Sequence, residues 1–266
     1  MRQALRHFIP LLMLTPLGAV AQTNDYKVTS GMKPDAMPKP LRPEHHNPLP
    51  TPIFDKPLNA EQSSTASLSV DTAHQVILLI GDSMTDGLGH IFVDYAAEND
   101  YELHTVVWYG SRTDHWAKRG DLDYHIKRVH PTFIVLCLGT NDLGFYDFNR
   151  RQQWINDIIN KVGNIPYVWI GPLPWAKIRN RDLVGIIRDC VGEKRFFDSS
   201  NIQIPRADGI HPTLAGAKVW MNKIAQWLSN PETTLHPLQM RTPTRTVRFV
   251  ADEKHTPRYK GRPAME

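Results

Sequence analysis

An uninterrupted apolar run at residues 76–80 (Val-Ile-Leu-Leu-Ile) constrains the fold of this chain more than any other feature. The run is rich in β-branched residues and stops at Gly81, which permits a tight turn. A short apolar run bounded by turn residues is typical of a strand buried on both faces, and such strands belong to parallel sheets covered by helices. The sequence therefore predicts an α/β fold.

A serine follows this predicted strand directly, in the segment Gly81-Asp82-Ser83. Either Asp82 or Ser83 can cap the helix that the residues from Asp86 onward are predicted to form. A hydroxyl at this junction lies at the carboxyl edge of the sheet, with helix N–H groups directed toward it. The position suits a nucleophile, although a plain helix cap is the more frequent role when such a segment stands alone.

Three more motifs accompany this serine along the chain. Gly110 ends a second apolar run, and Gly139-Thr140-Asn141-Asp142 follows a third. Asp208-Gly209-Ile210-His211 precedes the last amphipathic segment. In this order the motifs resemble the four blocks of the SGNH (GDSL-like) hydrolase family, over roughly residues 76–228. The family's common name, GDSL, has leucine at the position of Met84. Replacing leucine by methionine conserves side-chain volume.

Hydrophobic periodicity predicts five strands that alternate with helices. The strands are expected at residues 74–80, 103–109, 132–138, 166–170 and 195–197, and the helices at residues 86–99, 121–128, 149–162, 181–191 and 214–228. This alternation predicts a three-layer α/β/α domain with a five-stranded parallel sheet. The resemblance implies the flavodoxin-like strand order 2-1-3-4-5, which would bring Ser83 and Asn141 together at one edge.

Asp208 and His211 are three residues apart, so both side chains can lie on one side of a turn. A buried carboxylate bonded to imidazole Nδ1 fixes the tautomer and leaves Nε2 to accept a hydroxyl proton. Alone, the pair is more often a surface turn; the resemblance implies a catalytic triad of Ser83, His211 and Asp208. It also implies an oxyanion hole formed by the backbone N–H groups of Ser83 and Gly110 and the side-chain amide of Asn141.

Each oxyanion residue also has a structural interpretation: Gly110 as a plain turn after a strand, and Asn141 as a loop-stabilising amide. Asp82 is expected to act as a helix cap or as an orienting residue, and Asp142 is expected to anchor its loop. The candidate substrate contacts share aromatic or charged side chains in loops, which suit sugars or acidic polymers; they are Arg112, His115, Trp116 and Trp175. The equally weighted alternative is that these side chains anchor their loops.

The expected reaction needs no cofactor and no metal, and no Cys/His cluster has the spacing of a zinc site. The two cysteines, Cys137 and Cys190, are interpreted as packed thiols rather than a disulfide.

The amino end has the pattern of a secretory signal peptide. Arg2 and Arg6 precede an apolar stretch at residues 8–20, and small residues predict cleavage after Ala21. Residues 22–70 are a proline-rich linker or arm, and residues 71–230 are the predicted hydrolase domain. We therefore expect a secreted or periplasmic protein with no transmembrane segment and no nucleic-acid partner.

Residues 231–266 form a basic tail, with seven basic residues against four acidic ones, a net charge of +3 out of +4 for the chain of 266 residues. The favoured interpretation is a solvated, partly disordered extension. Contact with an anionic envelope polymer or lipid head groups is the alternative.

The function expected from these features is that of an exported serine esterase. Its partner would be a small-molecule or polysaccharide ester, and the expected acyl group is short, acetyl above all. Alternatives on the same triad are a lysophospholipase or thioesterase and an O-acyltransferase. A non-enzymatic carbohydrate-binding protein is less favoured, because nucleophile, base and oxyanion donors all occur together.

Overall fold

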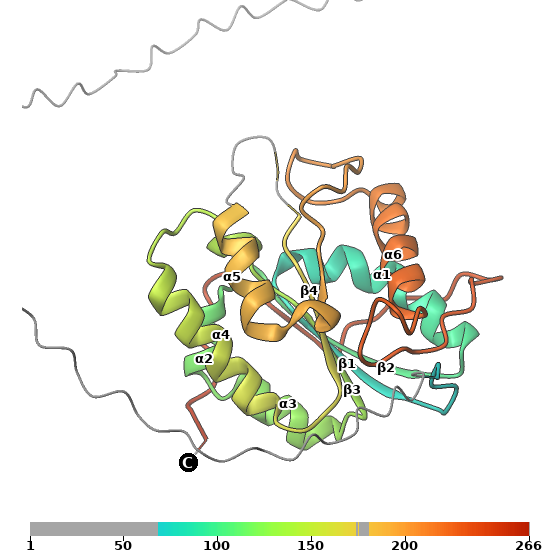
Figure 1. The fold of residues 1–266 in the computed structure, drawn as a ribbon, viewed down its shortest axis with the longest axis horizontal. Coiled ribbons are helices and arrows are strands. Elements are labelled where there is room, and N and C mark those ends of the chain that lie inside the picture. The colour runs from blue at the N-terminus through green and yellow to red at the C-terminus, as the bar shows by residue number, and fades with distance from the viewer. Residues whose placement is uncertain (1–68, 174, 176–180, 266) are drawn as a thin grey trace, which may run out of the picture. The chain divides into compact units, whose positions relative to one another are not determined.

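The computed structural model describes residues 69–173, 175 and 181–265, so the predicted signal peptide and nearly all of the proline-rich segment lie outside the described residues. Within them, one six-stranded parallel sheet has the order β5-β4-β3-β1-β2-β6 (Figure 1). The strands are β1 (Val76–Gly81), β2 (Glu102–Trp108), β3 (Phe133–Cys137), β4 (Tyr167–Ile170), β5 (Phe196–Phe197) and β6 (Glu253–His255). Strands β1 to β5 have the expected order 2-1-3-4-5, and β6 is an addition.

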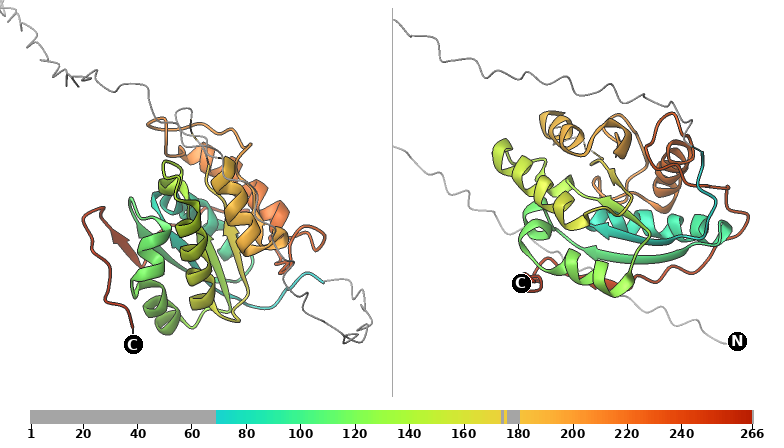
Figure 2. Two further views of the ribbon diagram at one scale, coloured as in Figure 1. Left: turned by 60° about the vertical axis from the view of Figure 1, so that its left-hand side comes forward. Right: turned by 60° about the horizontal axis from the view of Figure 1, so that its bottom comes forward.

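Helices cover both faces of this sheet, as predicted. They are α1 (Ser83–Glu98), α2 (Thr113–Lys118), α3 (Asp121–Val129), α4 (Phe148–Val162), α5 (Arg181–Val191) and α6 (Leu214–Leu228), with short 3₁₀ helices η1 (Thr140–Asp142) and η2 (Glu193–Arg195). Helices α1 and α6 lie on one side of the sheet and α2 to α5 on the other (Figures 1 and 2). None of the helices in the described part of the chain has the length and apolarity that a bilayer crossing requires.

The two hydrophobic cores explain why the first strand lacks polar residues. Ile77 and Leu79 pack into the core on the side of α1 and α6, whereas Leu78 and Ile80 pack into the core on the other side. All four side chains are fully buried. A strand that is covered on both faces has apolar side chains on each face, so its sequence is a continuous apolar run.

Two local features differ from the sequence prediction. Helix α1 begins at Ser83 rather than Asp86, because the Asp82 carboxylate caps it and accepts the Met84 N–H at 2.9 Å. Helix α2 occupies a segment that was predicted as loop. Cys137 and Cys190 are free thiols, as predicted.

The C-terminal segment packs against the domain, so the predicted solvated extension is wrong for its described residues. Strand β6 runs parallel to β2 and pairs Glu253 with Val106 and His255 with Trp108. Before β6, the Val247 N–H donates to Asp94 Oδ1 at 2.7 Å. The segment therefore supplies an edge strand to the sheet (dark red in Figure 2).

A buried carboxylate fastens the last part of this segment. Asp121, the first residue of α3, is fully buried. Its Oδ1 accepts from Tyr259 Oη and Arg262 Nη1, each at 2.8 Å, and its Oδ2 accepts the Arg262 backbone N–H at 2.8 Å. Lys254 is also paired, with its Nζ 2.6 Å from Asp86 Oδ1. Two basic residues of the tail are thus in ion pairs within the domain.

Replacing Arg262 tests whether this anchor stabilises the domain. Arg262→Gln leaves the Asp121 carboxylate without its cation, which should lower the free energy of unfolding by about 2–3 kcal/mol; partial exposure of Arg262 keeps the effect below that of a fully buried pair. Urea unfolding measures the change. Arg258→Gln, on an exposed residue of the same segment, should change stability by less than about 0.5 kcal/mol. Equal stabilities of both variants and the wild type would contradict the role of Asp121.

Candidate active site

The site begins where β1 ends against β3. A Cβ atom at Gly81 would lie 2.0 Å from the Cys137 carbonyl oxygen, so only glycine permits this approach of the two strands. The next residue, Asp82, donates its N–H to the same carbonyl at 3.2 Å. Ser83 follows as the first residue of α1. The close packing of β1 against β3 therefore determines the position of the Ser83 hydroxyl.

The Asp82 carboxylate connects the loops that follow β1 and β3. It is fully buried, and it accepts the N–H groups of Met84 at 2.9 Å and Thr140 at 3.3 Å. Burial raises the pKa of Asp82 to about 7; the two backbone hydrogen bonds oppose the increase, and the nearby Asp142 adds to it. Asp82 caps α1 and orients the turn before Ser83, the place that the sequence analysis expected for it.

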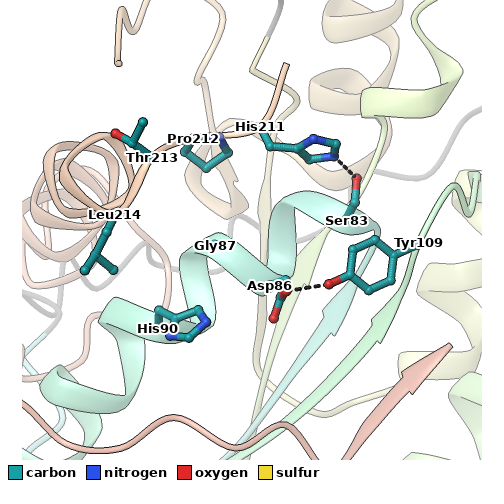
Figure 3. A pocket seen from close by; sticks show the side chains of 9 residues that line it. All are labelled: Ser83, Asp86, Gly87, His90, Tyr109, His211, Pro212, Thr213 and Leu214. Carbon is teal, nitrogen blue, oxygen red and sulfur yellow. Dashed lines mark hydrogen bonds between the residues drawn. The ribbon is translucent and has the colours of Figure 1, made fainter. Parts of the chain in front are cut away.

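The histidine of the last motif lies beside this serine, although the two are 128 residues apart in the chain. His211 Nε2 is 2.9 Å from Ser83 Oγ, and His211 Nδ1 is 2.7 Å from Asp208 Oδ2. Figure 3 shows the imidazole ring directed at the hydroxyl. The three side chains thus form a continuous hydrogen-bonded row that can pass a proton from hydroxyl to imidazole.

The carboxylate of this row is exposed, whereas the sequence analysis expected a buried one. Side-chain exposure is 55% for Asp208 and 39% for His211. Hydrogen bonds from the His211 ring, the His211 N–H and the Ile210 N–H hold the pKa of Asp208 well below its ordinary value. Asp208 therefore remains charged, and its hydrogen bonds, rather than burial, hold it in its orientation.

The predicted oxyanion residues lie at the same edge of the sheet. Gly110 follows β2 in a left-handed conformation with φ of +73°, which favours glycine. Asn141 lies in η1, after β3, and its Nδ2 donates to the Ser111 carbonyl at 2.9 Å. That is its one side-chain bond within the described residues, so its second N–H remains for a ligand. Because β2 and β3 both flank β1, the turns carrying Gly110 and Asn141 flank Ser83.

Asp142 occupies a buried position that holds this region together. It accepts the Thr113 N–H at 3.0 Å and the Thr113 hydroxyl at 2.8 Å, and Arg151 Nη1 lies 2.9 Å from it. Burial raises its pKa, although these bonds and the Arg151 charge act in the other direction. The residue ties η1 to α2 and α4, in line with the loop-anchoring role expected from the sequence.

A cleft of about 440 Å³ opens beside Ser83 and His211 (Figure 3). Its walls come from α1, from the turn after β2 and from the start of α6; the lining residues are Ser83, Asp86, Gly87, His90, Tyr109, His211, Pro212, Thr213 and Leu214. Leu214 is 65% exposed. The cleft thus combines apolar surface with several polar side chains next to the hydroxyl.

Sequence reasoning missed the polar group at the floor of this cleft. Tyr109 donates its hydroxyl to Asp86 (Figure 3). Lys254 from β6 pairs with the other carboxylate oxygen. Burial acts to raise the pKa of Asp86, but Lys254 and Tyr109 outweigh it and lower the value. The helical spacing offered a signal, because Asp86 and His90 lie three and seven residues after Ser83 and so share its face of α1.

The candidate substrate contacts lie elsewhere, and two of them anchor the first turn of α2. The Arg112 side chain donates to Asp114 at 3.1 and 3.2 Å, and its backbone N–H donates to His115 Nδ1 at 3.2 Å. The His115 ring stacks on Trp108 with 5.0 Å between centroids. Neither Arg112 nor His115 lines the cleft.

The two tryptophans proposed as substrate contacts pack against the core on the side of α2 to α5. Trp116 is 1% exposed and donates its Nε1–H to Ser111 Oγ at 2.9 Å. This burial excludes direct contact between Trp116 and a substrate. Trp175 is half-buried against the same core. The interpretation as anchoring groups accounts for both positions.

No known family model matches the sequence, and no curated protein matches it either. Solved structures with a similar fold include an acetyl xylan esterase, AlAXEase, at 18% identity and a TM-score of 0.46, over 57% of this chain and 98% of that one. A lipolytic protein of the G-D-S-L family from Desulfitobacterium hafniense DCB-2 has 16% identity and a TM-score of 0.46, over 56% and 97%. A Clostridium thermocellum family 3 carbohydrate esterase has 17% identity and a TM-score of 0.45, over 56% and 94%.

Likenesses this weak assign no activity to the chain. Support for the fold comes from the chain itself. The strands have the predicted order, and the four motifs follow β1, β2 and β3 and precede α6. The fold is a three-layer α/β/α arrangement whose strands β1 to β5 have the flavodoxin-like order 2-1-3-4-5. In this fold the four motifs, distant in sequence, lie around the carboxyl edge of β1.

The pH dependence of stability tests the environment of Asp82. A carboxyl whose pKa is higher in the folded state binds a proton on folding, so its stabilising contribution is present below its ordinary pKa and is lost as the pH rises through about 7. Between about pH 4 and pH 8 the wild type should lose about 2 kcal/mol or more relative to Asp82→Asn, which cannot ionise. Chemical denaturation at each pH measures this difference.

Asp157→Asn on α4 is the control, because it removes a carboxylate that is only half-buried. It should keep the wild-type slope of stability against pH. Parallel curves for the wild type and Asp82→Asn would show that Asp82 does not carry the raised pKa.

Proposed function

We propose that this protein is an SGNH-type serine esterase that cleaves O-acyl esters through Ser83, His211 and Asp208. The observation that carries the proposal is the row of hydrogen bonds from Asp208 through His211 to Ser83, which opens into a cleft. An unactivated serine is a weak nucleophile, and an imidazole within hydrogen-bond reach is what activates it.

The reaction follows from these positions. His211 Nε2 takes the hydroxyl proton while Ser83 Oγ attacks the ester carbonyl, and Asp208 stabilises the resulting imidazolium. The backbone N–H groups of Ser83 and Gly110 and the amide of Asn141 donate to the oxyanion. As the tetrahedral intermediate collapses, the imidazolium gives its proton to the leaving alcohol oxygen. Water then repeats the sequence on the acyl-enzyme, releasing the acid and restoring Ser83.

The proposed substrate is a short O-acyl ester, acetyl above all, on a polar alcohol such as a sugar. Asp86, His90 and Tyr109 supply hydrogen-bonding groups to the cleft, and sugar hydroxyls need such partners. The predicted signal peptide, ending at Ala21, would place the enzyme outside the cytoplasm, where acetylated envelope or extracellular carbohydrate is available.

A lysophospholipase or thioesterase is the second candidate. Pro212 and the exposed Leu214 favour it, because they offer apolar surface to a longer acyl chain within the same cleft. The two candidates share the chemistry and differ in the acyl length that the cleft prefers.

Removal of the nucleophile tests the reaction itself. Ser83→Ala should lower kcat/KM for p-nitrophenyl acetate by about 10⁴-fold or more, because it removes the hydroxyl that His211 would activate. The variant should also lose labelling by a serine-directed fluorophosphonate. Ser200→Ala is the matched control, since Ser200 lies in a loop outside the cleft, and it should keep both activity and labelling. Full activity in a folded Ser83→Ala protein would exclude the mechanism.

A series of p-nitrophenyl esters tests the acyl specificity, because the leaving group stays constant. We expect kcat/KM for the octanoate to be at least about tenfold below that for the acetate. Leu214→Ser should leave acetate hydrolysis unchanged and lower any octanoate hydrolysis. A preference for octanoate that Leu214→Ser abolishes would favour the lysophospholipase or thioesterase. Acetate release from acetylated polysaccharide then tests the sugar substrate.

A further inference from the structure

A buried histidine outside the cleft has no hydrogen-bond partner in the part of the chain that the structure describes. His125 lies on α3 and is fully buried, and neither of its ring nitrogens has a hydrogen-bond partner within the described residues. A buried imidazole normally satisfies at least one nitrogen, because leaving both unpaired is unfavourable. The proposed esterase reaction makes no use of this residue. A buried imidazole without hydrogen bonds among the described residues calls for a ligand.

Two side chains of β6 complete a cluster with His125. Glu253 and His255 are two residues apart on a strand, so they point to the same face. The ligand atoms of these three residues all lie within 4.8 Å of one another. Glu253 Oε2 is 3.6 Å from His125 Nε2 and 2.8 Å from His255 Nε2. Among the described residues, His255 Nε2 has no well-formed hydrogen bond despite this contact.

These separations suit a small tetrahedral cation. Two ligand atoms at about 2.1 Å from a tetrahedral zinc ion are about 3.4 Å apart. The distances of 2.8 and 3.6 Å around Glu253 Oε2 fall on either side of that value. Two imidazoles and one carboxylate are also donors that zinc binds well, with water as a fourth ligand.

We propose that His125, Glu253 and His255 bind a divalent transition-metal ion, with zinc as the best fit, and that this ion fastens β6 to α3. The site is structural, because its three ligands lie outside the residues that line the cleft. Its ligands come from α3 and from β6, near the end of the chain, so bound metal would hold the C-terminal segment in place.

Neighbouring groups orient the ligands. Arg262 Nη2 donates to both oxygens of Glu253 at 2.9 Å, and each carboxylate oxygen retains a lone pair for a metal. Asp121 balances the charge of Arg262. The His255 ring stacks on Tyr259 with 3.8 Å between centroids and 10° between planes. Such surroundings are typical of the residues that hold metal ligands in place.

An ion-pair network without metal is the competing explanation. Arg262 already neutralises Glu253, and this pair would account for the carboxylate. It leaves His125 without a hydrogen bond among the described residues, because Nε2 lies 3.6 Å from Glu253 Oε2 and Nδ1 has no hydrogen-bond partner there. A metal bound to His125 Nε2 would satisfy that nitrogen and also the buried Nε2 of His255.

The test uses the full chain without an affinity tag, because a polyhistidine tag would bind the probe. Metal-free protein is titrated with Zn²⁺ in competition with a chromophoric chelator. We expect one tight site per chain and a higher Tm with zinc than with EDTA. His125→Gln and His255→Gln should each weaken this site by about 100-fold. His74→Gln, on a half-exposed histidine away from the cluster, should bind zinc like the wild type.

Trypsin gives a readout at the strand itself, since Lys254 lies between the two β6 ligands. Zinc should slow cleavage after Lys254 in the wild type and in His74→Gln but not in the cluster variants. If a histidine variant fails to fold, Glu253→Gln replaces it, with circular dichroism to verify folding. Equal zinc affinity in all variants, or a wild-type Tm that is the same in EDTA and in zinc, would overturn the proposal.

Discussion

The contact between β1 and β3 at Gly81 is the constraint on which the candidate site depends. The two strands approach so closely that no side chain fits between them, and the Cys137 carbonyl accepts the Asp82 N–H. The chain must therefore leave β1 at one angle and enter α1 with Ser83 as its first helical residue. A helix start also directs N–H groups toward the space above the strand. The packing of β1 against β3 thus determines the position of Ser83 at the edge of the sheet.

Buried carboxylates hold the loops around that edge, at an electrostatic cost. Asp82 joins the turn after β1 to Thr140, and Asp142 joins η1 to Thr113 on α2. Both lose solvation, which raises their pKa values, and in each case backbone N–H groups oppose that increase. Asp208 is the opposite case, because it remains in water and is fixed by the bonds to its own turn. The loop bearing His211 is therefore held by local bonds, whereas the loops around Ser83 are held by the core.

The sequence predicts the parts of this molecule that follow local rules. Continuous apolar runs predict β1 and β3 because both strands are buried on two faces, and the helical period predicts α4, α5 and α6 closely. Strand β6 could not be predicted in this way, since Glu-Lys-His has no apolar period and exists as a strand only through its pairing with β2. Trp116 was ambiguous for a similar reason, because its burial depends on tertiary contacts rather than on neighbouring residues. The positions of Ser83 and His211 were expected only through the family resemblance, and their distance is a property of the folded chain.

Strand β6 links the cleft to the opposite side of the sheet through the two-residue period of a strand. Lys254 points toward α1, where it pairs with Asp86 at the cleft, whereas Glu253 and His255 point toward His125 on α3. A one-residue shift of β6 would exchange these faces, separating Lys254 from Asp86 and both β6 ligands from His125. The register of a three-residue edge strand is weakly specified by backbone bonds alone. The ion pairs of Arg262 with Asp121 on one face and of Lys254 with Asp86 on the other therefore specify the register, and a metal at the proposed site would hold it further.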